Sequence, residues 1–158
     1  MRVYRGYSSP VATPTVLAIG NFDGVHRGHA ALVERLVETS ARLHLPPTVL
    51  TFEPHPREFF APQSAPARLT TLREKLELLA EAGAAQAMVC RFDAAFAALT
   101  ADEFISRVLL QGLQVRHLII GDDFRFGRGR HGDFALLQAA GGQQGFGVEA
   151  MDSVIVDG

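Results

Sequence analysis

The segment Gly20–His29 (GNFDGVHRGH) brings glycines, an acid and two histidines together where an apolar stretch ends and a helical pattern begins. Glycines allow the backbone to approach a ligand closely, and the free amides and positive dipole end of a helix N-terminus attract phosphate. His26 and His29 are three residues apart, so their rings can lie on the same side of the helix start. The segment predicts a phosphate site whose histidines could stabilise the negative charge of a phosphoryl transition state.

Two other interpretations of this histidine pair stay open. The rings could be solvated side chains at a helix start, without a chemical role. They could also bind zinc, but the pair supplies only two ligands, so Cys90 or another histidine would have to complete the site. The position between a strand end and a glycine-flanked helix start favours the phosphate interpretation.

Polar residues follow three later apolar stretches as well, in Glu53–Arg57, Arg91–Asp93 and Gly121–Arg130. Prolines fix their own φ and restrict the residue before them, so the first cluster is a stiff segment that could present Arg57 to a phosphate. The neighbouring Phe59 and Phe60 could either enclose a ring system or pack inward.

The third cluster, Gly121–Arg130 (GDDFRFGRGR), alternates aromatic and basic residues after paired acids. Phe124 and Phe126 could flank a planar ring, Asp123 could accept a hydrogen bond, and the arginines could meet phosphate. Arginines interleaved with aromatic rings could also stack on RNA bases. A position at a strand end favours a small-molecule site.

The elements that must position these clusters alternate between apolar and amphipathic patterns. The patterns predict strands over 16–19, 48–52, 87–90, 117–120 and 147–151, and helices over 28–43, 71–82, 100–110 and 133–140. We expect the proline-rich segment 46–62 to be non-helical outside its strand. Uniformly apolar strands predict an α/β fold, a Rossmann-like parallel sheet with helices on both faces. Ligands in such folds bind beyond the carboxyl ends of the strands, where all the clusters lie.

The composition excludes several classes of function. The 158 residues carry a net charge of −2 with 47% apolar and 20% charged residues, which is typical of a globular domain and argues against a protein that coats nucleic acid. Lys75 is the only lysine and no P-loop motif is present, so phosphate must be bound by arginine, histidine or backbone amides. One cysteine excludes a disulfide framework. No membrane span or signal peptide is visible, so we expect a cytoplasmic protein without a membrane partner.

Three motifs, in order along the chain, resemble those of the prokaryotic FAD synthetases, the bifunctional riboflavin kinase/FMN adenylyltransferases. The segment Gly20–His29 resembles the first motif of that family and ends in the HxGH signature of the nucleotidyltransferase superfamily. Thr51–Arg57 (TFEPHPR) is similar to the TFxPHP segment, and Gly121–Gly127 (GDDFRFG) to the GxDFRFG segment. Arg68–Thr70, followed by the helix that contains Lys75, also fits. The resemblance covers essentially the whole chain.

The resemblance implies adenylyl transfer from ATP to FMN, with FAD and pyrophosphate as products. Mg²⁺ would accompany ATP without direct protein ligands. His26 and His29 would be the catalytic residues, clamping the triphosphate. The implied ATP contacts are Gly20, Phe22, Gly24, His26, Gly28 and His29. The implied FMN contacts are Asn21, Asp23, His55, Arg57, Asp123, Phe124, Arg125 and Phe126.

The family pattern continues past the last residue of this chain, into a serine- and threonine-rich motif that touches ATP phosphates and then a β-barrel riboflavin kinase domain. We therefore expect residues 1–158 to be an FMN adenylyltransferase domain truncated at its C-terminal end, with the kinase domain as its partner in a full-length parent. Two alternatives stay open: a catalytically incomplete module that binds flavin or adenine nucleotide, and an adenylyltransferase for another phosphorylated acceptor.

Overall fold

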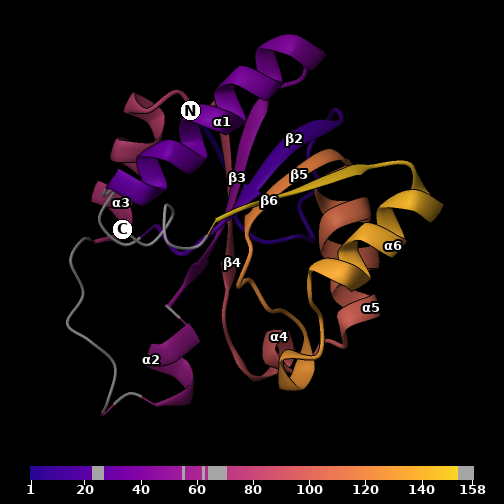
Figure 1. The fold of residues 1–158 in the computed structure, drawn as a ribbon. Coiled ribbons are helices and arrows are strands. Elements are labelled where there is room, and N and C mark those ends of the chain that lie inside the picture. Colours follow the sequence, from indigo (N-terminus) through magenta and orange to yellow (C-terminus); the bar gives the residue numbers. More distant parts are fainter. Residues whose placement is uncertain (23–26, 55, 62, 64–70, 153–158) are drawn as a thin grey trace.

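The computed structural model describes residues 1–22, 27–54, 56–61, 63 and 71–152, and its strands and helices alternate along the chain (Figure 1). The strands are β1 (Arg2–Tyr4), β2 (Thr15–Ile19), β3 (Pro47–Glu53), β4 (Gln86–Arg91), β5 (Val115–Gly121) and β6 (Gly147–Met151). The α-helices are α1 (Arg27–Leu43), α2 (Pro56–Phe60), α3 (Leu72–Glu81), α4 (Ala94–Ala97), α5 (Ala101–Glu103) and α6 (Phe134–Gln144). A π-helix, η1 (Phe104–Gly112), continues α5, and a single 3₁₀ turn, η2 (Arg128–Arg130), precedes α6.

The strands form one six-stranded sheet in the order β1-β4-β3-β2-β5-β6, and every neighbouring pair is parallel. After β2 the chain adds β3 and β4 on one side, and it then crosses back to place β5 on the other side of β2. The strand order therefore reverses between β2 and β5. In open parallel sheets, the crevice outside the carboxyl ends of the strands at such a reversal is where ligands bind.

Alternate residues of each strand face opposite layers of helices, as the two-residue period of a strand requires. In β2, Val16 and Ala18 pack in the cluster that includes Leu32 and Leu36 of α1. Leu17 belongs to the other cluster, with side chains from α4, η1 and α6. Figure 1 shows α1 and α3 on one side of the sheet and α5 and α6 on the other. The prediction of a parallel sheet with helices on both faces is thus confirmed.

Two of the predicted helices begin at a threonine, and each of these threonines forms a complete capping box. Thr71 Oγ1 accepts from the Glu74 amide at 3.1 Å while the Glu74 carboxylate accepts from the Thr71 amide at 3.2 Å. Thr100 and Glu103 repeat the arrangement at 3.1 and 3.0 Å. The reciprocal bonds satisfy amides that have no partner inside the helix, which explains why α3 and α5 begin where the sequence pattern puts them.

Three features differ from the sequence-based predictions. Strand β1 was not predicted, because three residues are too short to show a period. Helix α2 makes the prediction of a non-helical proline segment wrong: Pro56 is its first residue, where the missing amide has no helical partner to lose. The helix predicted over 100–110 is a short α-helix followed by a π-helix that extends to Gly112.

Candidate active site

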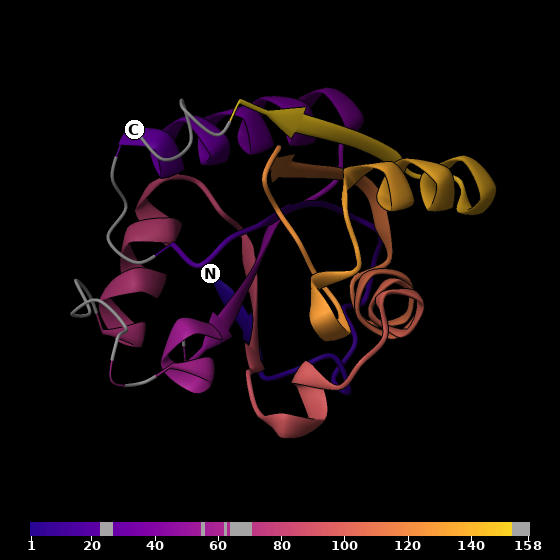
Figure 2. The same cartoon turned by 60° about the horizontal axis from the view of Figure 1, so that its bottom comes forward.

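The polar clusters meet at the carboxyl edge of the sheet. In the register of the sheet Ala18 pairs with Ile119, so the segments that begin at Gly20 and Gly121 leave adjacent strands at the reversal of strand order. Glu53 of β3 lies opposite Arg91 of β4 at the same edge. Figure 2 turns this edge toward the viewer, with magenta α2, salmon α4 and the orange turn η2 along it.

The residues just after β2 form a tight, buried turn. The Gly20 amide donates to the Leu50 carbonyl of β3 at 3.1 Å. Phe22 adopts a positive φ of 53° and its ring is completely buried. A Cβ atom on Gly20 would lie 3.0 Å from the Phe22 ring, so packing alone requires a small residue there. An ATP contact from Phe22 would therefore use its backbone and not its ring.

Several predicted site residues have no described side chain. Asp23, Gly24, His26 and His55 lie outside the described residues. The backbones of Gly28 and His29 form the first turn of α1, as the predicted helix start requires, and Arg57 belongs to α2. Their contacts to ATP or FMN stay predictions.

Lys75 of α3 is a residue of this edge that the sequence-based site prediction left without a role. It is only 3% exposed, and its Nζ donates to the Asn21 carbonyl at 2.8 Å and to Thr51 Oγ1 at 3.2 Å. Nζ also lies 3.5 Å from the Phe52 carbonyl and 4.0 Å from Glu53 Oε2. One sequence signal could have found it: Lys75 shares its helix face with Leu79, four residues on, which is fully buried.

The segment after β5 is fixed by ring packing and by an ion pair to the helix that follows it. The rings of Phe124 and Phe126 stack with centroids 5.7 Å apart, and Arg125 lies 3.9 Å from Asp133, which caps α6. Phe126 is 5% exposed and also packs on Phe104. We therefore assign the Phe126 ring to the core, which leaves it little surface for the flavin contact that the sequence suggested.

The other predicted residues of this segment remain accessible. Phe124 is half-buried, while Asp123 and Arg125 are exposed. Their positions directly after β5, at the carboxyl edge, are those of ligand-facing residues in a parallel α/β sheet.

An aromatic cluster lies beside the end of β3 and β4. Phe59 and Phe60 of α2 are 37% and 66% exposed, so they do not pack inward as one interpretation of the sequence had it. Their ring centroids each lie 5.6 Å from that of Phe92, the residue after β4. An exposed surface of this kind can take up a planar apolar ring.

Cys90 does not have the properties of a zinc ligand or nucleophile. Its side chain is 1% exposed among core residues of the layer that contains η1. Burial raises the pKa of the thiol to about 12, whereas metal binding and nucleophilic attack need the thiolate. The neighbouring Asp93 caps α4 by accepting from the Phe96 amide at 2.9 Å, so its role is structural.

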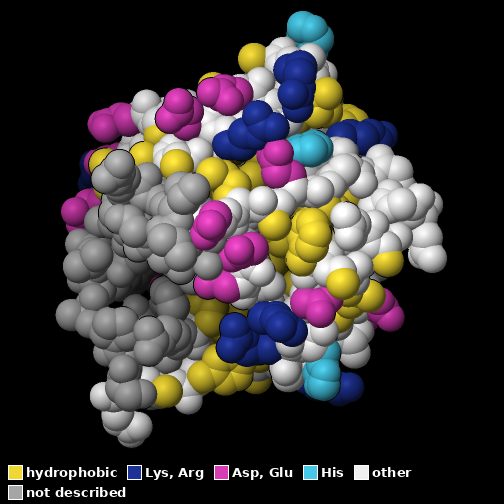
Figure 3. Space-filling view, viewed as in Figure 1, with side chains coloured by type: hydrophobic (Ala, Val, Ile, Leu, Met, Phe, Trp, Pro, Cys, Tyr) yellow, Lys and Arg dark blue, Asp and Glu magenta, His cyan; other side chains and the backbone are white. Residues whose placement is uncertain are grey.

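Charges of both signs lie close together on one face of the molecule. Figure 3 shows basic, acidic and hydrophobic side chains mixed on the described part of the face seen in Figure 1. One ion pair is bidentate: Arg35 of α1 donates to both carboxylate oxygens of Glu149 of β6, at 2.9 and 2.8 Å. These hydrogen bonds hold the pKa of Glu149 below its usual value.

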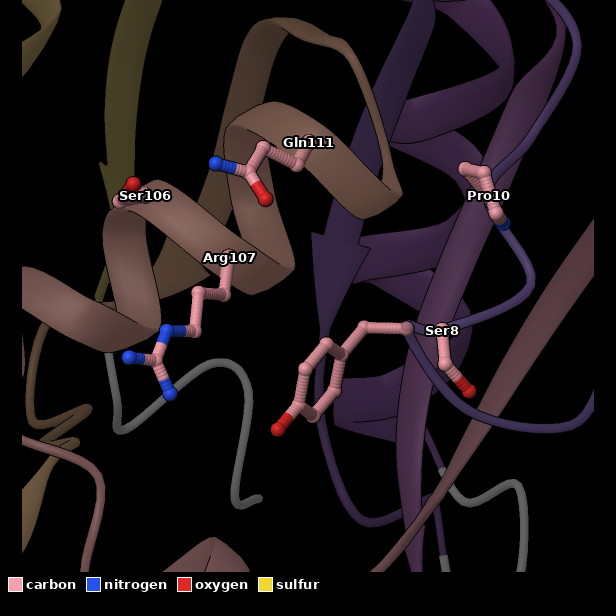
Figure 4. A pocket seen from close by; sticks show the side chains of 6 residues that line it. Ser8, Pro10, Ser106, Arg107 and Gln111 are labelled. Atoms are coloured by element: carbon pink, nitrogen blue, oxygen red, sulfur yellow. The ribbon is translucent and has the colours of Figure 1, made fainter.

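A separate hollow of about 390 Å³ lies between the N-terminal loop and η1. Figure 4 shows its lining, which consists of Tyr7, Ser8, Pro10, Ser106, Arg107 and Gln111. Arg107 already pairs with Glu103 at 2.9 Å, and among the site residues that the structure describes, none lines the hollow. We assign it no part in the site at the carboxyl edge.

Within the described ranges, no three His, Cys, Asp or Glu side chains gather as a metal-binding group. None of the described helices is long and apolar enough to cross a membrane.

Comparison with known proteins identifies the family. A parallel α/β sheet with its motifs at the reversal of strand order defines a nucleotide-binding type of fold. The family model for FAD synthetase matches residues 8–158, and the chain belongs to the FAD synthetase family.

The chain is 54% identical over 151 residues to the bifunctional riboflavin kinase/FMN adenylyltransferase of Escherichia coli K12, covering 94% of this chain and 48% of the relative. It is 47% identical to the protein of the same description from Pseudomonas fluorescens, covering 100% of this chain and 51% of the relative. The chain thus spans about half the length of the curated relatives it matches.

A crystal structure described as a macrolide-efflux protein from Streptococcus pneumoniae has the same fold, with a TM-score of 0.74 at 22% identity. The match covers 96% of this chain and 50% of that protein. This likeness supports the fold alone.

Proposed function

We propose that this chain transfers the adenylyl group of ATP to FMN, forming FAD and pyrophosphate. The observation that carries the proposal is the meeting of three family motifs at one edge of the sheet, after β2, β3 and β5. Relatives at 47–54% identity are described as bifunctional riboflavin kinase/FMN adenylyltransferases, which supports the proposal.

In the proposed reaction an oxygen of the FMN phosphate attacks the α-phosphorus of ATP. The new oxygen–phosphorus bond forms as the bond to the β-phosphate oxygen breaks, and pyrophosphate leaves. The backbone amides at the start of α1, with His26 and His29, would donate hydrogen bonds to the triphosphate as charge builds in the transition state. Such a reaction needs positioning and charge stabilisation more than a strong base.

The flavin ring would lie on the aromatic cluster of Phe59, Phe60 and Phe92. The exposure of Phe60 supports this, because covering an exposed aromatic ring with a planar ligand removes apolar surface from water and so favours binding. Asp123 and Arg125, both exposed after β5, would contact polar groups of FMN together with His55 and Arg57.

Mg²⁺ would arrive with the triphosphate and neutralise part of its charge. Magnesium in nucleotide sites is held largely by phosphate oxygens and water, with at most one or two carboxylates. The exposed Asp122 and Asp123 are oxygen donors of this type at the carboxyl edge, so the residues present fit a metal carried by the substrate.

Incubation of the chain with FMN, ATP and Mg²⁺, followed by chromatography for FAD, tests the proposal. We expect FAD to form with FMN as acceptor and no adenylylated product with riboflavin or phosphopantetheine. Absence of FAD, with a thermal shift on addition of FMN or ATP, would reduce the chain to a binding module. An adenylylated product with phosphopantetheine alone would assign the site to a different acceptor.

A further inference from the structure

We infer that Lys75 is a positioning residue for the adenylyl transfer proposed above, holding the turn at Asn21 and Phe22 that precedes the histidine motif. The inference rests on that proposed function for its activity test. It rests on the structure alone for the contacts, since Lys75 is not among the residues that the family resemblance assigned to a substrate.

Two segments of the chain, the residues after β2 and the end of β3, contact the ammonium of Lys75 on α3. Its Nζ donates to the Asn21 carbonyl after β2 at 2.8 Å and to Thr51 Oγ1 of β3 at 3.2 Å. Thr51 Oγ1 also lies 3.1 Å from the Asn21 carbonyl, to which it donates. Lys75 therefore lies between Thr51, near the end of β3, and Asn21, which follows β2 and precedes the histidine motif.

Burial makes this network a strong constraint. A buried ammonium group must keep its hydrogen-bond acceptors, because leaving it without them costs far more than the same loss at the surface. With Lys75 only 3% exposed, the Asn21 carbonyl is fixed relative to both α3 and β3.

The turn that Lys75 holds is a strained one. Phe22 has a φ of 53°, a left-handed backbone conformation that residues other than glycine rarely adopt. Such a conformation persists only when its surroundings determine it fully. Here the buried Phe22 ring fixes one side of the turn and Lys75 fixes the carbonyl on the other. Without the ammonium, the turn can relax and change the position from which the chain continues toward α1.

A displacement of this kind would act on the ATP side of the reaction. The residues that follow Phe22 include His26 and the first turn of α1, which the proposed function assigns to the triphosphate. A shift of about 1 Å in reacting groups can cost roughly 100-fold in rate. The flavin-side residues on α2 and after β5 are held by other contacts, so binding of FMN should change little.

Lys75→Met and Arg73→Met form a matched pair for the test. Both replace a cation of α3 by methionine, but Arg73 is exposed and pairs with Glu77 of the same helix. We expect Lys75→Met, assayed at a temperature where circular dichroism shows it folded, to lower kcat/KM for ATP about 100-fold. The Kd for FMN should stay within about threefold, and Arg73→Met should match the parent.

Hydrogen exchange supplies a readout that does not depend on activity. In Lys75→Met we expect faster amide exchange in a peptide that spans residues 17–22, with peptides from β5 and β6 unchanged. If the parent forms no FAD, the proposed function fails, while the exchange comparison still decides the role of Lys75. Unchanged exchange in 17–22, or a kcat/KM for ATP equal to that of Arg73→Met, would overturn the inference.

Thr51→Val keeps the inference testable if Lys75→Met does not fold. It removes one acceptor of the ammonium and one donor to the Asn21 carbonyl while preserving shape. We expect a folded variant with about tenfold lower kcat/KM for ATP and faster exchange in 17–22. A folded Thr51→Val that matches the parent in both measurements would also contradict the role assigned to Lys75.

Discussion

The two segments that leave the sheet at its reversal of strand order are held in place in different ways. After β5 many contacts are local: Phe124 stacks on Phe126, and Phe126 pairs with Gly132 through backbone hydrogen bonds. The segment also packs on the helical layer beside it, through Phe126 on Phe104 of η1. After β2 the Asn21 carbonyl is held from outside, by Lys75 of α3. The segment after β5 (121–130), which the proposed function places on the flavin side, is thus held by ring packing and backbone pairing. The segment after β2 (20–29), which the proposed function places on the ATP side, has its Asn21 carbonyl held by a buried ammonium from a distant helix.

This difference separates substitutions that should change the rate of FAD formation from substitutions that should change the free energy of unfolding. Changes at His26 and His29 of the ATP-side segment should mainly alter turnover, because the proposed function gives both side chains a role in the transition state. Changes at Phe126 and Gly127 of the flavin-side segment should mainly alter stability, because these residues pack against η1 and α5.

The largest effect should come from the histidines of the ATP-side segment. We expect His26→Ala combined with His29→Ala to lower kcat/KM for FAD formation by at least about 1,000-fold, since each ring would donate to the transition state. The free energy of unfolding should change little. The measurement is the initial rate of FAD formation by chromatography, together with urea unfolding.

His44→Asn is the matched control for the histidine pair. His44 is exposed just after the end of α1, away from the carboxyl edge, and its positive φ of 57° is one that asparagine tolerates. It should keep the parent rate. A double variant of His26 and His29 that turns over like His44→Asn would remove the ATP-side segment from the chemistry.

A stability effect should dominate in the flavin-side segment. Gly127 has a φ of 77°, and a Cβ atom there would lie 2.7 Å from the Ala101 amide nitrogen. We expect Gly127→Ala to lower the free energy of unfolding by at least about 2 kcal/mol, through backbone strain and the clash with α5. Urea unfolding followed by circular dichroism measures the loss.

Gly142→Ala provides the comparison for that substitution. Gly142 is an exposed residue of α6 with no atom within 4 Å of an added Cβ, so alanine should stabilise the chain by up to about 1 kcal/mol. Equal effects of the two substitutions would mean that Gly127 does not fix the segment.

The smallest predicted effect concerns the ion pair between α1, which follows the ATP-side segment, and β6, beside the flavin-side strand. Arg35 and Glu149 are partly exposed, so Glu149→Gln should cost only about 1 kcal/mol at pH 7. Glu38→Gln, which removes the longer and more exposed contact to Arg35 at 3.8 Å, should cost less than about 0.5 kcal/mol.

The pH dependence of this pair has a definite sign. Because the pKa of Glu149 lies below its ordinary value of 4.5 in the folded chain, its stabilising contribution is complete above pH 4.5 and is lost as pH falls through the folded pKa. The difference in stability between the parent and Glu149→Gln should therefore shrink between pH 7 and pH 3. A difference that stays constant over this range would exclude the assigned ion pair.

The sequence alone predicted the sheet, its helices on both faces and the edge where the motifs meet, because these follow from periods and capping boxes. It did not predict β1, which is too short for a period to show. It also missed α2, since prolines suggest a break although a first-turn proline is tolerated. Tertiary packing decides such cases.

The site was less accessible from the sequence than the fold. Alternating aromatic residues do not reveal that Phe126 is buried while Phe124 is only half-buried, because a short loop has no fixed period. Lys75 has the pattern of an ordinary helical lysine, and only its place on the face of Leu79 indicates burial. Its partners Asn21 and Thr51 lie 54 and 24 residues away in the sequence, which no local pattern can connect.

One measurement tests the central claim, adenylyl transfer at the reversal of strand order, most directly. The chain is incubated with FMN, Mg²⁺ and ATP labelled at its α-phosphate, and the products are separated. We predict that the label appears in FAD, in equal amount to the pyrophosphate released, and that the double variant of His26 and His29 abolishes its transfer. Label that stays in ATP, or is released as AMP without FAD, would contradict the claim.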